Sequence, residues 1–262
     1  MPPNGLRATT PVTALALLVT LAGCGALTST HERPTDAATD AKRPGTHTVA
    51  AAPPPAALPA AGPPRGLPER LPGLGLGTRA RIPRSAEQVL IVTGDGYDDS
   101  TATVVLHQRT PQGWRPGTTW AAHNARDGWT TDHRIDDLRS PIGVFTLTDA
   151  GGRLRDPGAR LPYHRSQDFT VEGLGFNGES LDGSFDYVVA INYNREPGTS
   201  PLDRARPLGA DRGGGIWLHV DHDGPTHGCV ALSERHMRQL LLLLDPARHP
   251  VVVMGDKASL AR

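Results

Sequence analysis

The sequence is poor in cysteine, in aromatic residues and in long apolar runs. It has 262 residues but only two cysteines, Cys24 and Cys229, and 5% aromatic residues. Cys229 is the only cysteine beyond the N-terminal segment, so it has no disulfide partner. Basic and acidic residues balance at 27 each, so no net field favours nucleic acid or an acidic surface. The apolar run over residues 11–22 is shorter than the roughly 20 residues that span a bilayer, which favours an export signal over a permanent helix.

The end of that apolar run predicts lipidation. Leu21-Ala22-Gly23-Cys24 resembles a bacterial lipobox, in which the cysteine receives a lipid and becomes the new N-terminus. We therefore expect residues 1–24 to be a lipoprotein signal peptide that ends at Cys24. The lipid would anchor the protein to the outer face of the cell membrane, from where it would reach into the cell wall. An ordinary secretory signal that happens to contain a cysteine is the alternative.

Composition divides the remainder of the chain into three parts. Residues 25–84 are rich in Ala, Pro, Gly and Thr, which predicts a disordered and extended tether, or a plain spacer. Residues 85–256 are enough for one domain of ordinary size, and residues 257–262 form a short tail. The sequence contains no internal repeat.

Most of residues 85–256 is typical of short strands rather than helices. One helix is expected, because Ser233 can cap it and the apolar stripe that follows has helical spacing before Asp245-Pro246 ends it. Long polar loops over 150–186 and 195–214 are expected to flank a site. The predicted fold class is mainly β, a sandwich or distorted barrel with one or two packed helices. The expected strands cover 89–93, 101–108, 113–123 (an edge strand broken by Pro116), 142–149, 187–194, 216–221 and 249–255.

The lone cysteine lies in Thr226-His227-Gly228-Cys229, ten residues after His219. A thiol beside two imidazoles suggests an activated nucleophile, since the thiolate is the form that attacks. Because the connection between them is short, His219 and Cys229 are expected side by side, with His219 taking the thiol proton. The amides of Gly228 and Cys229 are plausible donors to an oxyanion, and His227 would orient the substrate or tune the thiolate.

The segment HVDHDGPTHGCVAL over residues 219–232 resembles the signature of bacterial L,D-transpeptidases of the YkuD type. Residues 140–145, SPIGVF, resemble a second stretch of that family, and the resemblance covers most of residues 88–255. It implies that Cys229 is the nucleophile and His219 the general base, whose other nitrogen is held by the Val220 carbonyl. It also gives His227 and Thr226 supporting positions and places Gly228 at the oxyanion hole.

The resemblance implies peptidoglycan cross-linking by a monomer that uses no metal and no organic cofactor. The thiolate attacks a stem tetrapeptide, releases the terminal D-alanine and forms a thioester, which the amine of a neighbouring stem resolves. If water resolves the thioester instead, the same site is an L,D-carboxypeptidase. Two departures stand out: Ala231 occupies a position where the family often has Arg or Asn, and the gap between His219 and Cys229 is short.

Three other interpretations stay open at this point. A zinc site would draw on His219, His222, His227 and Cys229, although their spacing matches no standard zinc motif. A papain-like endopeptidase is disfavoured because the histidine precedes the cysteine here. A non-catalytic lipoprotein that only binds wall polymer is the third.

Several further residues are weaker candidates. Tyr187, Asn192 and Tyr163, together with Thr226, are expected to contact the substrate. Phe176 and Tyr163 are candidates for a lid. His222, His236 and His249 are expected at the surface or at caps.

Overall fold

Runs of valine, isoleucine and leucine build the central sheet, since their alternating side chains are buried on both of its faces. The computed structural model describes residues 66–262. Ten strands within this range form one curled sheet in the order β6-β12-β1-β2-β3-β11-β10-β9-β7-β8, while β4 and β5 pair separately. The strands are β1 (Gln88–Gly94), β2 (Thr101–Thr110), β3 (Gly113–His123), β4 (Trp129–Thr130), β5 (Ser140–Pro141), β6 (Gly143–Thr146), β7 (Ala150–Gly152), β8 (Tyr163–Arg165), β9 (Val188–Ala190), β10 (Trp217–Val220), β11 (Val230–Leu232) and β12 (Val251–Asp256).

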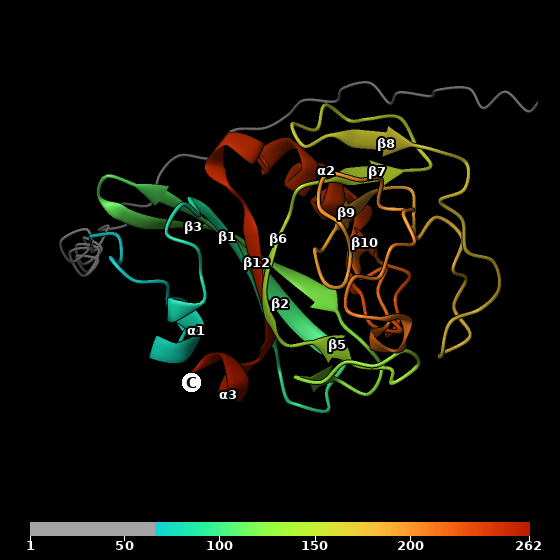
Figure 1. The fold of residues 1–262 in the computed structure, drawn as a ribbon, viewed down its shortest axis with the longest axis horizontal. Helices are drawn as coiled ribbons and strands as arrows, with labels where there is room; N and C mark the ends of the chain where they lie inside the picture. The colour runs from blue at the N-terminus through green and yellow to red at the C-terminus, as the bar shows by residue number, and fades with distance from the viewer. Residues whose placement is uncertain (1–65) are drawn as a thin grey trace, which may run out of the picture. The chain divides into compact units, whose positions relative to one another are not determined.

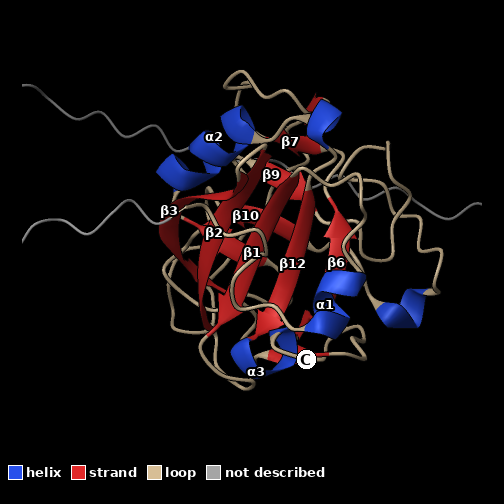
Figure 2. Ribbon diagram, turned by 90° about the vertical axis from the view of Figure 1, so that its left-hand side faces the viewer, coloured by secondary structure: helices blue, strands red, loops and turns tan. Residues whose placement is uncertain are grey.

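The two faces of the sheet belong to different apolar clusters. On β1, Leu90 and Val92 join the larger cluster, which also holds the apolar residues of the C-terminal helix α2 (Glu234–Leu243). Val89 and Ile91 alternate with them and join the smaller cluster on the opposite face. β1 pairs in parallel with β12 and antiparallel with β2. Figure 2 shows β3, β2, β1 and β12 side by side in the middle of this sheet.

The expected helix is present as α2. The Ser233 side chain caps it by accepting a hydrogen bond from the His236 amide. Its stripe, Met237, Leu240 and Leu241, is fully buried in the larger cluster, which explains why this segment is helical. The other helical elements are α1 (Leu76–Ala80), α3 (Lys257–Leu260), η1 (Ala210–Arg212) and η2 (Pro246–Arg248).

The prediction of a mainly β fold with packed helices is confirmed. Figure 1 shows the long connections of residues 150–215, drawn in yellow and orange, beside β9 and β10. Among residues 66–262, no helix has both the length and the apolar character needed to cross a membrane.

Several of the expected elements differ from the structure. The strand β3 is not at an edge, because it lies between β2 and β11; Pro116 is tolerated because the pairing with β11 is confined to Ala122 and His123. The strand expected over 187–194 stops at Ala190 as β9. The segment 150–186, expected as loop only, contributes β7 and β8 to the sheet.

The packed part of the chain extends past the boundaries that the sequence predicts at residues 84 and 256. Leu71 and Leu74 are 4% and 5% exposed and pack with Leu260 of α3 in the smaller apolar cluster. The Gly75 amide donates to the Leu260 carbonyl oxygen at 2.8 Å, so α1 and α3 lie together near the C-terminus, as Figure 1 shows. The folded part therefore includes segments assigned to the tether and the tail. The rest of the expected tether and the signal segment with Cys24 lie outside the described residues.

A buried ion pair fixes the loop that follows β9. The Asp149 carboxylate accepts from the Arg195 guanidinium at 2.9 Å, and their side chains are 5% and 2% exposed. The same carboxylate accepts from the Gly198 amide at 2.9 Å, and the guanidinium donates to the Thr199 carbonyl oxygen at 2.8 Å. Two charges buried so deeply need each other, because water cannot replace a lost partner.

Replacing one partner should therefore destabilise the fold strongly. Asp149→Asn should lower the free energy of unfolding by about 3–5 kcal/mol, since it leaves the Arg195 charge buried and uncompensated. Urea denaturation followed by circular dichroism measures the change. Asp182→Asn is the matched control, because that partner of Arg153 is 79% exposed, and it should leave the midpoint unchanged. Equal midpoints for the two variants would contradict the role of the buried pair.

Candidate active site

Two neighbouring parallel strands carry the predicted nucleophile and base. In this pair Leu218 lies opposite Val230 and His219 lies opposite Ala231. Paired residues project to the same face, and residues two apart along a strand share a face. Cys229 directly precedes β11 and lies two residues before Ala231, so its side chain projects to the same face as His219. The prediction that these residues lie on adjacent segments is confirmed.

The Cys229 thiol contacts the backbone leading into β10. Its Sγ accepts a hydrogen bond from the Trp217 amide at 3.4 Å and donates to the Gly215 carbonyl oxygen at 3.6 Å. Within residues 66–262 no hydrogen bond joins this sulfur to His219, so the expected hydrogen-bonded pair is not formed. Cys229 is half-buried, so its sulfur is partly removed from water. This desolvation raises the pKa of the thiol from 9.0 to about 11, against the opposing effect of the Trp217 amide.

His219 is held as a neutral imidazole with one open nitrogen. Its Nδ1 lies 2.8 Å from the Val220 carbonyl oxygen, the contact that the sequence resemblance implies. A carbonyl only accepts, so Nδ1 carries the hydrogen and Nε2 keeps a lone pair. The residue is 3% exposed, and the Phe185 ring packs edge-on at 5.4 Å. Burial lowers the pKa of His219 from 6.5 to about 4, and the bond to Val220 offsets part of this effect.

The sequence analysis missed a second layer behind His219. The His222 ring stacks on the His219 ring with centroids 5.9 Å apart, and its Nδ1 lies 3.1 Å from Oε1 of Glu179. These side chains are 5% and 13% exposed, so the expectation of a surface His222 is wrong. β10 ends at Val220 and Asp223 has a φ of 64°, so the chain turns and brings His222 back over His219. No sequence signal connects Glu179 to this turn.

Two hydroxyl groups hold the carbonyl oxygen of Cys229. Thr226 Oγ1 donates to it at 2.7 Å, and Ser140 Oγ donates at 3.3 Å. Ser140 also accepts from the Ala125 amide at 3.1 Å. The second sequence stretch, residues 140–145, therefore begins at the cysteine loop. Thr226 is 3% exposed, which indicates a structural role in this loop.

The loop at Gly228 leaves backbone donors free. A Cβ at this position would lie 3.0 Å from Ile216 Cδ1, so only glycine fits without displacing that side chain. Within residues 66–262 the amides of Gly228 and Cys229 donate to no protein acceptor. Two adjacent free amides next to a thiol can bind a negatively charged oxygen.

His227 lies on the outer side of the loop and is exposed. The Phe176 ring, from the connection before β9, packs on its imidazole with centroids 4.7 Å apart. The Arg126 guanidinium lies 5.1 Å from the centre of the Phe176 ring. The expected lid candidate therefore does contact the motif, through His227.

The three weaker substrate candidates lie elsewhere. Tyr187 is 4% exposed in the core, with the Arg238 guanidinium of α2 at 5.8 Å, so it does not line the site. Asn192 donates to Thr146 and Thr148 at 2.7 and 2.9 Å. Tyr163 belongs to β8, which is separated from β10 by β9 and β7.

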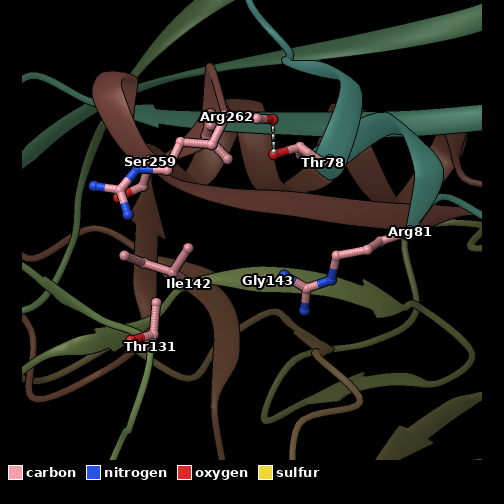
Figure 3. A pocket seen from close by; sticks show the side chains of 9 residues that line it. Thr78, Arg81, Thr131, Ile142, Gly143, Ser259 and Arg262 are labelled. Carbon is pink, nitrogen blue, oxygen red and sulfur yellow. Dashed lines mark hydrogen bonds between the residues drawn. The ribbon is translucent and has the colours of Figure 1, made fainter.

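A cavity of about 290 Å³ lies apart from the cysteine loop, between α1, α3 and β6. Arg81, Thr131 and Ser259 are among its lining residues, and Figure 3 shows their side chains around it. Neither Cys229 nor His219 lines this cavity. Over residues 66–262 no group of three or more His, Cys, Asp and Glu side chains is arranged to hold a metal ion.

The part of the chain that carries these residues matches a known family. The family model of the L,D-transpeptidase catalytic domain, YkuD, matches residues 100–253, more than half of the chain. The chain belongs to the L,D-transpeptidase family. The matched range contains Ser140, His219 and Cys229.

Two solved structures resemble this L,D-transpeptidase-family chain at 17% sequence identity. The helical cell shape determining protein Pgp2 from Campylobacter jejuni matches with a TM-score of 0.37, over 65% of this chain and 48% of that one. Bdellovibrio bacteriovorus Bd1075 matches with a TM-score of 0.38, over 71% and 53%. The chain spans about half the length of each. No curated protein matches it.

The resting thiol should react slowly at neutral pH. Because desolvation raises the pKa of Cys229 to about 11, its alkylation by iodoacetamide should accelerate about tenfold per pH unit between pH 7 and pH 10. Mass spectrometry of the Cys229 peptide measures the rate, with N-acetylcysteine as the reference thiol. A rate that is already constant below pH 7 would reveal a preformed thiolate–imidazolium pair and contradict the neutral resting state.

Proposed function

We propose that this protein is a peptidoglycan L,D-transpeptidase that cross-links stem peptides by acyl transfer through Cys229. The carrying observation is the parallel pairing that puts His219 and Cys229 on one face of the sheet. The free amides of Gly228 and Cys229 and the open Nε2 of His219 supply the other groups that acyl transfer requires. Membership in the family supports the same reaction class.

The first half-reaction forms a thioester. The thiol proton moves to Nε2 of His219 while the sulfur attacks the carbonyl carbon at the L-centre of the stem diamino acid. Because burial lowers the pKa of His219 and raises that of Cys229, this transfer accompanies the attack rather than preceding it. The amides of Gly228 and Cys229 stabilise the oxyanion. Its collapse expels D-alanine, whose nitrogen takes the proton from His219.

The second half-reaction resolves the thioester. The amine of a neighbouring stem attacks the same carbonyl carbon, the carbon–sulfur bond breaks, and the cysteine thiol is restored. Attack by water would instead make the site an L,D-carboxypeptidase. The nucleophile, base and oxyanion donors are shared by both outcomes, and only the acceptor differs.

Intact-mass spectrometry of the purified full chain with a carbapenem tests the nucleophile. The mass should rise by one carbapenem on Cys229, and Cys229→Ala should abolish the adduct. Incubation with a stem tetrapeptide should release D-alanine and give a cross-linked product when an acceptor stem is present. No adduct together with unchanged tetrapeptide would favour a protein that binds wall polymer without catalysis.

The base is tested by the same acylation. His219→Ala should slow carbapenem acylation by about 100-fold or more, the usual contribution of a positioned base. His236→Ala is the matched control, because His236 belongs to α2 and stacks on Trp120. Equal acylation rates for the two variants would exclude His219 as the base.

We further propose that the protein acts outside the cytoplasm, anchored by lipid at Cys24. The lipobox at residues 21–24 is the support for this proposal.

Membrane fractionation tests the anchor. Cys24→Ala should release the protein from the membrane fraction, because the modified sulfur is lost. Immunoblotting of the two fractions measures the shift, and Cys229→Ala, which keeps the lipobox, is the control. Unchanged retention of Cys24→Ala would defeat the anchor.

A further inference from the structure

A second histidine shares the sheet face of Cys229. His123 is the last residue of β3 and lies opposite Ala231 of β11. Ala231 in turn lies opposite His219 on its other side. The side chains of His123, Ala231 and His219 therefore form a row across β3, β11 and β10. Cys229 lies two residues before Ala231, on the same face of the sheet.

The imidazole of His123 crosses over the strand between them. Its Nδ1 lies 3.0 and 3.1 Å from the two carboxylate oxygens of Asp221, which directly follows β10, two strands away. The Asp223 amide donates to the same carboxylate at 3.1 Å and helps to fix it. Ala231, two residues after Cys229, is fully buried, and its small methyl group leaves room for this bridge.

The bridge gives His123 the orientation of a general base. A carboxylate only accepts, so Nδ1 donates to it, and in the neutral ring Nε2 keeps its lone pair. Nε2 has no hydrogen-bond partner among residues 66–262, and the side chain is 29% exposed. A carboxylate that holds one ring nitrogen while the other is open is the arrangement that prepares histidine to accept a proton.

The two histidines of the row differ in their surroundings. The hydrogen bond to Asp221 raises the pKa of His123 above 6.5, and Asp223 and Glu179 add to this effect while burial opposes it. Its neighbour on β2 is the uncharged Thr101. Burial lowers the pKa of His219 instead. When the surroundings shift the pKa values of two histidines in opposite directions, the two side chains are suited to different roles in proton transfer.

The register makes His123 and Cys229 diagonal neighbours on adjacent segments. Diagonal neighbours on adjacent strands are roughly 7–8 Å apart. An amine nitrogen that lies about 3 Å from the thioester carbon on Cys229 and about 3 Å from Nε2 of His123 would bridge this distance.

We propose that His123, held by Asp221, is the general base of the second half-reaction and takes the proton of the acceptor amine. The inference rests on the proposed acyl transfer through Cys229. The acceptor ammonium gives one proton to Nε2 of His123, and its nitrogen forms the bond to the thioester carbon. The carbon–sulfur bond then breaks, and the sulfur takes a second proton, which the attacking nitrogen loses through His219. His123 releases its own proton to solvent.

A chemical acyl donor separates this step from the natural substrate. The full chain carrying Cys24→Ala, in which Cys229 is the only thiol, is acetylated with p-nitrophenyl acetate, and the burst of p-nitrophenolate reports acylation. Glycinamide is then added as the amine, and intact-mass spectrometry follows loss of the acetyl group. Cys229→Ala supplies the background. His123→Gln should keep the burst and slow aminolysis by about 100-fold.

The pH dependence of the aminolysis rate distinguishes a general base from a residue with a structural role only. Aminolysis should rise with pH as His123 loses its proton and then level off. Since Asp221 raises that pKa, Asp221→Asn should move the inflection to lower pH. His236→Gln should change neither the burst nor the profile. Wild-type aminolysis in His123→Gln, or an inflection that Asp221→Asn leaves in place, would overturn the proposal.

The outcomes also separate this inference from the proposed function. Acetyl transfer that depends on His123, without release of D-alanine from the stem tetrapeptide, would support the base and overturn the peptidoglycan substrate. Release of D-alanine together with aminolysis that does not depend on His123 would support the peptidoglycan substrate and overturn His123 as the base. No acetylation of Cys229 would overturn both.

Discussion

The parallel pairing of β10 with β11 is the constraint on which the site depends. It sets His219 opposite Ala231, so the position of the imidazole relative to Cys229 is fixed by backbone hydrogen bonds rather than by a flexible loop. The backbone just before this pairing also holds the cysteine side chain, because the Trp217 amide donates a hydrogen bond to the Cys229 sulfur. Sites built on strands are held more accurately than sites built on loops, and this one sits in the middle of a ten-stranded sheet.

Around this pair, burial and charge assign different properties to chemically identical rings. His219 is enclosed and bonded to a neutral carbonyl oxygen, whereas His123 is partly exposed and bonded to a carboxylate. His222 contacts both His219 and Glu179, and thereby links His219 to the connection that precedes β9. The site is thus a layered arrangement in which the surroundings, more than residue type, decide what each imidazole can do.

The sequence was informative where the structure is local. The segment from His219 to Cys229 is short, so its two key residues had to end on neighbouring segments, and Ser233 with its apolar stripe was sufficient to place α2. The contacts of His123 with Asp221 and of His222 with Glu179 join residues 98 and 43 positions apart. They depend on strand order and on a turn after β10, which residue patterns in one sequence do not encode. The limits of the fold were not readable for a related reason, because Leu71 lies in a segment of linker-like composition and packs in one cluster with Leu260 of α3.

The enclosure of Cys229 also bears on its survival in an oxidising environment. Conversion of a cysteine to sulfenic acid proceeds through the thiolate, and further steps to sulfinic and sulfonic acid are irreversible in most proteins. A sulfur that stays protonated, with the Trp217 amide and the Gly215 carbonyl oxygen around it, offers little thiolate to peroxide. The same desolvation that makes the resting thiol slow is therefore a chemical safeguard for a lone cysteine that has no resolving partner in the described part of the chain.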